Sequence, residues 1–187
     1  MLEGTGSLVF DNKNKTIFLS QSSRGSLSAL DPFMKTFDKV QPGFRVLCFS
    51  ALDQSGNQVY HTNVVLSVLD HHLLCCLDSI QEHTSCEKEK SVEAKQIHRD
   101  EIAEWASECG KALVNLSHEE MNNFCGNIIQ LRNKKGESVV VMSERARRSY
   151  KNPTWMESYS HIVSADITTI ENIGGGSTNF YGGLKKL

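Results

Sequence analysis

A supersecondary pattern that occurs three times is the feature that most restricts the fold of this sequence. Two short β-rich runs, a segment with helical periodicity and a further β-rich run follow one another, and the same order then starts again twice. The three rounds cover about residues 3–52, 61–117 and 124–167. A unit repeated at this length is typical of repeat and propeller architectures. The sequence therefore predicts an α/β fold built of ββαβ units.

The first round shows the elements of the pattern. Gly6–Asp11 and Thr16–Ser20 are rich in β-forming residues, and the polar run Asn12–Lys15 between them predicts a hairpin. Ser26–Val40 has apolar residues at helical spacing, and Phe44–Ala51 closes the round as a strand. The expected order is therefore strand, strand, helix, strand.

The later rounds repeat this order with one interruption. The other expected strands are Asn63–Leu69, Leu73–Leu77, Ala112–Leu116, Asn127–Leu131, Ser138–Ser143 and His161–Asp166, with helices near residues 99–111 and 143–150. The interruption, Gln81–Gln96, is charged and has little apolar periodicity, so we interpret it as an insertion that forms a solvated loop or an exposed helical extension. Residues 174–181 are expected to start a further strand. The whole chain, 1–187, is predicted to be a single domain.

The charge balance argues against two classes of partner. The 187 residues include 20 basic and 22 acidic side chains, for a formal net charge of −2. That balance gives no basic field for nucleic acid or for an anionic membrane. No apolar run is long enough for a spanning helix, and the N-terminus lacks the basic flank of a signal peptide. We therefore expect a cytoplasmic protein that binds neither nucleic acid nor membrane.

The cysteines are expected to be reduced residues of the core. They are Cys48, Cys75, Cys76, Cys86, Cys109 and Cys125. A zinc site shared by Cys75 and Cys76 is disfavoured, because adjacent residues of a strand point to opposite faces. The neighbouring histidines, His71 and His72, are expected in an exposed turn. We expect no metal and no cofactor.

Two residues at the starts of repeat units could carry chemistry. Glu3 has glycines beside it that leave room for a ligand, and His61 can act as a general acid or base. Each residue alone is more typical of an ordinary loop. However, they hold equivalent places, as does Gly126–Asn127 in the third unit, and strands of a propeller point to one axis. We therefore expect them to converge. Arg24, which follows the second strand, could pair with a carboxylate or be a surface arginine.

Six runs of the sequence carry a family resemblance. They are LEGTGSLVFD, VYHTNVVLSV, LDSI, MNNFCGNIIQLRNKKGE, VVVMSERA and IENIGGGS. In this order they resemble the arginine deiminase-related amidinotransferase family, and most of all its branch of bacterial-type citrulline-utilisation hydrolases. The resemblance spans nearly the whole chain except the charged insertion and the last few residues. It implies the pentein fold, a closed ring of five ββαβ units around a central active site, of which this chain would hold about three.

The resemblance also implies guanidine-modifying chemistry on a small molecule such as arginine. In such enzymes a cysteine thiolate attacks the guanidinium carbon, a histidine transfers protons and acidic residues hold the planar cation. The adduct is then hydrolysed or passed to an amine. Glu3 matches the acidic residue and His61 matches the catalytic histidine. Arg24 and Asn63 match positions that bind substrate.

Two departures from the family pattern concern activity. The nucleophilic cysteine is expected three residues after Ser177, where this sequence has Phe180. Family members also carry a longer N-terminal part, with two further units and another acidic residue. We therefore expect a truncated chain that is inactive or very weak. The alternative is a non-enzymatic binding or regulatory protein that uses the residual acidic pocket or an exposed strand edge, and such an edge favours homo-oligomers.

Overall fold

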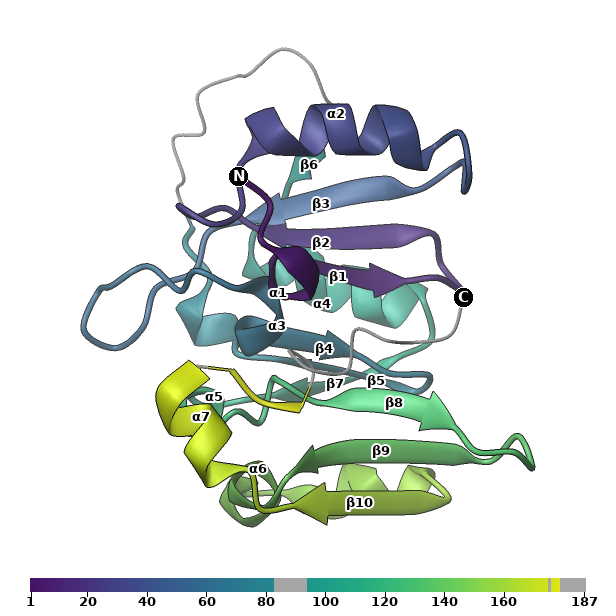
Figure 1. Cartoon of the computed structure of the whole chain (residues 1–187), viewed down its shortest axis with the longest axis vertical. Helices are drawn as coiled ribbons and strands as arrows, with labels where there is room; N and C mark the ends of the chain where they lie inside the picture. The colour runs from purple at the N-terminus through teal and green to yellow at the C-terminus, as the bar shows by residue number, and fades with distance from the viewer. Residues whose placement is uncertain (83–93, 175, 179–187) are drawn as a thin grey trace.

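The computed structural model describes residues 1–82, 94–174 and 176–178, which form a mixed α/β fold with three sheets (Figure 1). In the first sheet, β1 (Leu8–Asp11) pairs antiparallel with β2 (Thr16–Ser20) across the predicted hairpin turn. The chain then crosses over through α2 (Leu27–Phe37), and β3 (Arg45–Phe49) pairs parallel with β2. This is the predicted order of strand, strand, helix, strand.

The second sheet repeats the topology of the first. Here β4 (Leu66–Val68) pairs antiparallel with β5 (His72–Cys75). After α4 (Arg99–Glu108), β7 (Ala112–Asn115) pairs parallel with β5. The helix α4 begins with a capping box, in which His98 and Glu101 bond each other's backbone N–H groups.

The third sheet repeats it again. An antiparallel pair is formed by β8 (Ile129–Arg132) and β9 (Ser138–Ser143). The connection contains α6 (Glu144–Ser149) and the 3₁₀ helix η2 (Pro153–Ser158), after which β10 (His161–Ala165) pairs parallel with β9. The predicted ββαβ order is therefore confirmed in all three sheets, while the arrangement of such units in an incomplete ring stays a prediction.

Short helical turns stand where two of the predicted strands were expected to begin. The turn α1 (Gly4–Ser7) replaces the start of the first predicted strand, and α3 (Thr62–Val65) replaces the start of the fourth. The hydroxyl of Thr62 links them, because it donates to the carbonyl of Ser7 and accepts from the N–H of Ser20 at 2.7 Å. These contacts join segments far apart in the chain, so local β propensity could not reveal them.

The end of the charged stretch differs from its prediction. Ala94–Gln96 forms β6, which pairs parallel with β3, so these residues are neither a solvated loop nor a helical extension. The pairing satisfies backbone groups along the open edge of β3. Residues 83–93 of the stretch lie outside the described residues, as do residues 175 and 179–181 of the strand expected at 174–181, while the other residues of that segment form no strand. Four further short elements were not predicted: η1 (Leu77–Ser79), α5 (His118–Asn122), η2 and α7 (Thr168–Gly174).

Alternating side chains of β2 supply both faces of the first sheet. Ile17 and Leu19 pack in a cluster with Leu30 of α2, while Phe18 faces a larger cluster that spans all three sheets. In the larger cluster Phe18 meets Trp105 of α4 edge to face, with ring centroids 4.8 Å apart. The first sheet is thus covered by a helix on each face.

Four cysteines and one histidine are buried in the interior of the protein. Cys75, Cys76 and Cys125 are buried free thiols, as predicted, and Cys48 is buried as well. The prediction that His72 is exposed is wrong: the side chain is buried in β5, with Nδ1 3.0 Å from the hydroxyl of Tyr159. Aromatic residues that follow α6 cover this histidine, a tertiary effect that the sequence pattern does not contain. Across the described residues, no helix is both long and apolar enough to cross a membrane.

Candidate active site

Glu3, Arg24 and His61, which are far apart in sequence, meet at the start of β1. The Glu3 carboxylate lies between the other two, with Oε2 3.3 Å from His61 Nε2 and 3.2 Å from Arg24 Nε. The backbone fixes Glu3 in this position, because its N–H donates to the carbonyl of Arg24 at 3.0 Å and to the hydroxyl of Ser7 at 2.8 Å. The expected convergence of unit starts therefore occurs for Glu3 and His61.

His61 is held against the backbone of α1. Its side chain is 3% exposed, and a Cβ atom on Gly6 would lie only 2.9 Å from the ring. Burial lowers the pKa of His61 and outweighs the opposing effect of the Glu3 carboxylate, so the neutral imidazole dominates at neutral pH. Because an ionised carboxylate only accepts hydrogen bonds, Nε2 donates to Glu3, and Nδ1 is the nitrogen that can take up a proton.

Arg24 completes the cluster from the turn after β2. Its guanidinium lies 4.4 Å from the centroid of the Tyr60 ring, and Nη1 makes a second contact of 3.4 Å with Glu3 Oε1. The side chains of Arg24 and Glu3 are 44% and 39% exposed, so the ion pair can open toward solvent. The carboxylate beside the buried histidine thus already holds a planar guanidinium group.

Asn63 is buried in α3 with a side chain that has no hydrogen-bond partner among the described residues. The residue is 1% exposed, and both its amide nitrogen and its amide oxygen are unbonded. Buried polar groups of this kind are uncommon in native proteins, because each one loses its bonds to water. The Asn63 amide, two residues after His61, therefore has hydrogen-bonding capacity that no described residue uses.

A second buried asparagine, Asn127, links Asn63 to the C-terminal loop. Its Nδ2 donates to the carbonyl of Asn63 at 2.9 Å, and its Oδ1 accepts from the N–H of Ser177 at 3.0 Å. The Ser177 hydroxyl in turn donates to Glu171 Oε1 at 2.7 Å. The sequence pattern placed Gly126–Asn127 at a unit start but gave it no role. For Glu171, no sequence signal pointed to the site.

Four of the five thiols in the described part of the chain are poorly suited to nucleophilic attack. Burial raises the pKa of the Cys75, Cys76, Cys109 and Cys125 thiols, which disfavours the reactive thiolate. Phe180, at the position expected for the family's nucleophile, lies outside the described residues. Within the described part, no cluster of three histidine, cysteine or acidic side chains could hold a metal ion.

One family model matches nearly the whole chain. A family model described as eukaryotic N,N dimethylarginine dimethylhydrolase matches residues 1–179. Among curated proteins, none matches the sequence.

The structure is similar in fold to two solved proteins. One is ArgZ, an arginine dihydrolase from the ornithine-ammonia cycle in cyanobacteria, with a TM-score of 0.66 and 15% sequence identity. The other is a mutant of AgrE in its binary complex with L-arginine, with a TM-score of 0.63 and 14% identity. In both comparisons 94% of this chain is covered, but it spans only 23% and 22% of the respective solved chains.

Proposed function

The chain belongs to the eukaryotic N,N dimethylarginine dimethylhydrolase family, and from this premise we propose that Glu3, Arg24 and His61 form a guanidine-binding site. The match confirms the resemblance to pentein enzymes that modify arginine-like molecules. The observation that carries the proposal is the placement of the Glu3 carboxylate between a guanidinium group and a neutral imidazole. A carboxylate in this position holds a planar cation, and the histidine beside it can accept a proton.

The proposed binding step is an exchange of guanidinium groups at Glu3. The substrate's guanidinium takes the place of the Arg24 side chain, and the released Arg24 pairs with the carboxylate of an amino-acid substrate. Replacing one guanidinium by another changes little at Glu3 itself. Most of the affinity must therefore come from the new pair between Arg24 and the substrate carboxylate. Asn63 supplies hydrogen bonds from its unpartnered amide in the same region.

The exchange can be tested by calorimetric titration with arginine and with methylguanidine, which lacks a carboxylate. Arg24→Gln should strengthen methylguanidine binding, because it removes a competitor, and should weaken arginine binding. The preference for arginine should fall about tenfold or more. Arg147→Gln, which alters an arginine on α6 that contacts Ser164, is the matched control and should leave both affinities unchanged. If Arg24→Gln leaves the preference for arginine unaltered, the exchange does not occur.

We further propose that the chain as given binds guanidines with little or no turnover. Phe180 has no lone pair with which to attack the guanidinium carbon, and the four thiols described above favour the unreactive protonated form. Mass spectrometry should therefore detect no citrulline after incubation with arginine or dimethylarginine. Steady turnover that disappears in His61→Ala would contradict this proposal and would point to another nucleophile. Binding without turnover corresponds to the predicted alternative, a binding or regulatory protein with an acidic pocket.

A further inference from the structure

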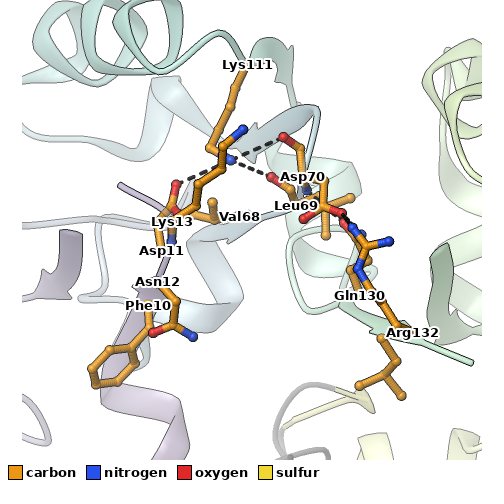
Figure 2. A pocket seen from close by; sticks show the side chains of 11 residues that line it. Phe10, Asp11, Asn12, Lys13, Val68, Leu69, Asp70, Lys111, Gln130 and Arg132 are labelled. Carbon is orange, nitrogen blue, oxygen red and sulfur yellow. Dashed lines mark hydrogen bonds and ion pairs between the residues drawn. The ribbon is translucent and has the colours of Figure 1, made fainter. Parts of the chain in front are cut away.

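A cavity of about 550 Å³, whose lining residues are drawn in Figure 2, lies at the end of the first strands that is far from Glu3 and His61. Its walls come from the ends of β1, β4 and β8, from the turns that follow β1 and β4, and from Lys111, which precedes β7. These three strands run in the same direction (Figure 1). Their starts are near the candidate active site, whereas their ends line this cavity. The cavity is therefore separate from the guanidine site. Its volume is in the range of small-molecule pockets.

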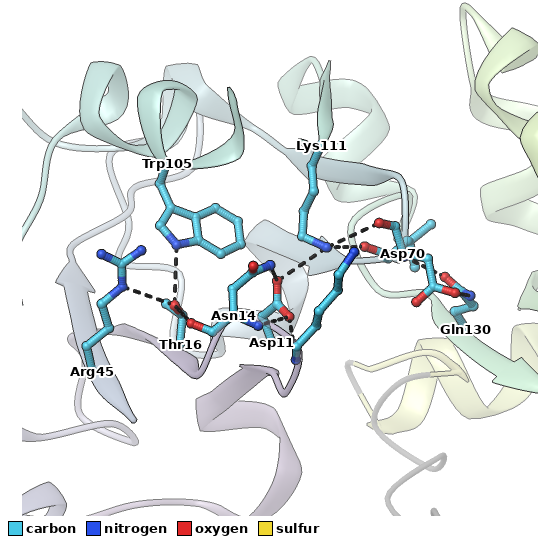
Figure 3. Close-up of polar contacts among 10 residues, drawn as sticks. Asp11, Asn14, Thr16, Arg45, Asp70, Trp105, Lys111 and Gln130 are labelled. Carbon is cyan, nitrogen blue, oxygen red and sulfur yellow. Dashed lines mark hydrogen bonds and ion pairs between the residues drawn. The ribbon is translucent and has the colours of Figure 1, made fainter. Parts of the chain in front are cut away.

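A buried ion pair closes one side of the cavity. Lys111 Nζ lies 3.3 Å from Asp11 Oδ2, and the two side chains are 2% and 4% exposed. The ammonium also donates to the carbonyl of Leu69 at 2.7 Å (Figure 2). Asp11 is further bonded by the side chain of Asn14 at 2.7 Å (Figure 3). Both members of the pair are thus committed to partners inside the protein.

One oxygen of the Asp70 carboxylate, the second carboxylate of the cavity, is also hydrogen-bonded within the protein. Asp70 Oδ2 accepts from Gln130 Nε2 at 2.6 Å and from Arg132 Nη2 at 2.7 Å. The N–H of Asp70 donates back to Gln130 Oε1 at 2.7 Å. These bonds join the turn after β4 to β8 and fix that rim of the cavity.

Apart from the Asn12 amide and Asp70 Oδ1, the remaining hydrogen-bonding capacity of the lining is cationic. Lys13 has no side-chain partner among the described residues, and its side chain is directed to the same side of the cavity as the Lys111 ammonium (Figure 2). Arg132 has donors beyond its bonds to Asp70 and Gly136. Three cations against two carboxylates leave one excess positive charge. The rest of the lining includes apolar side chains of Phe10, Val68, Leu69 and Leu131.

We propose that this cavity binds a small organic anion, namely a carboxylate attached to a short apolar body. Lys13 and Arg132 would bind the carboxylate, because their free donors and the excess charge match an acceptor-only anion. The apolar body would lie on the aliphatic and aromatic part of the lining. The buried pair of Lys111 and Asp11 would keep the wall rigid and take no part in ligand exchange.

Nuclear magnetic resonance titration with 3-phenylpropionate tests the proposal, with the neutral 3-phenylpropan-1-ol as matched ligand. The carboxylate should bind saturably, with a dissociation constant of about 1 mM. The shifted amide signals should be those of Lys13, Asp70 and Arg132, and the signals of Glu3 and His61 should stay in place. The alcohol should bind about tenfold more weakly. Equal affinity for the two ligands, or shifts centred on Glu3, would overturn the proposal.

Variants of exposed residues test which side chains bind the carboxylate, and because these residues are exposed, the substitutions should not prevent folding. Lys13→Met and Arg132→Met should each weaken 3-phenylpropionate binding about tenfold. Lys135→Met changes a lysine of the β8–β9 turn that does not line the cavity, and it should leave the affinity unchanged. If all three variants bind the carboxylate as the unaltered chain does, the cavity is not its site.

Discussion

The two ends of the first strands, β1, β4 and β8, differ in how their buried polar groups are satisfied. At the ends of the strands, Lys111 and Asp11 are almost fully buried, and both are bonded to several partners. At the starts, the buried Asn63 amide and one oxygen of the buried Glu171 have no partner among the described residues. We call the end with Lys111 and Asp11 the closed end, because its buried polar groups are bonded within the protein and stabilise the fold. We call the end with Asn63 and Glu171 the open end, because these residues have hydrogen-bonding capacity left for a ligand.

Removing the cation at the closed end should have the largest effect on stability. Lys111→Met leaves the buried Asp11 carboxylate without its ion pair, so unfolding in urea should show a loss of about 3–5 kcal/mol. Lys95→Met removes an exposed pair with Glu101 and should cost less than about 1 kcal/mol. Equal losses in the two variants would show that the closed end is not distinguished by its buried pair.

The stability changes on replacing the two buried asparagines of the open end, Asn63 and Asn127, can be compared directly. Asn127→Leu removes bonds to the carbonyl of Asn63 and to the N–H of Ser177, and should cost about 1–3 kcal/mol. Asn63→Leu removes an amide that has no partner, so its stability should change by less than about 1 kcal/mol in either direction. We nevertheless expect Asn63→Leu to weaken arginine binding. A large loss of stability in Asn63→Leu would mean that its amide is bonded after all.

Adding one methyl group at Gly6 should disturb the open end alone. The new Cβ would lie 2.9 Å from the His61 ring, which must move. Gly6→Ala should cost about 1–3 kcal/mol, and the ring proton signals of His61 should shift while those of His72 stay in place. Unchanged His61 signals would show that the ring is not packed on this backbone.

Lowering the pH should decrease the stability of the fold, because protonation of the buried His61 and His72 is unfavourable in the folded chain. Burial lowers the pKa of His72, and the charge of His71 lowers it further, while burial lowers the pKa of His61. The unfolded chain therefore binds more protons than the folded chain. Stability is complete above the unfolded pKa of about 6.5 and is lost as the pH falls below that value.

Urea unfolding between about pH 7 and about pH 5 measures this loss. Two histidines share it, so His72→Gln should show a pH-dependent loss about half that of the unaltered chain. His161→Gln alters an exposed histidine beside Glu137 and should keep the full dependence. A pH dependence that is the same in His72→Gln would exclude His72 as a source.

The hydrophobic pattern was enough to predict the order of the strands except β6, but not the details at the strand starts. Ser138–Ser143, for example, forms β9 as predicted, because its apolar run is bounded by clear turns. The turns α1 and α3 depend on Thr62, which bonds residues of distant segments, and burial of His72 depends on Tyr159. Such contacts leave no local signal in the sequence.

The candidate site could be predicted in part. The equivalent places of Glu3 and His61 at unit starts, together with the family motifs, were sufficient to expect their convergence. The sequence raised the pairing of Arg24 with a carboxylate but did not identify Glu3 as its partner. The links from Asn127 and Glu171 to Ser177 arise from tertiary packing and were not predicted. The incomplete ring, the truncation and association through strand edges stay predictions.

The most direct test of the central claim, a guanidine site at Glu3, is a titration of isotopically labelled protein with arginine. We predict saturable shifts of the Glu3, Arg24 and His61 amide signals, and their loss in Glu3→Gln, which keeps the shape of the side chain but removes its charge. Arginine-dependent shifts of the same size in Glu3→Gln, or no shifts at these residues in the unaltered chain, would contradict the account.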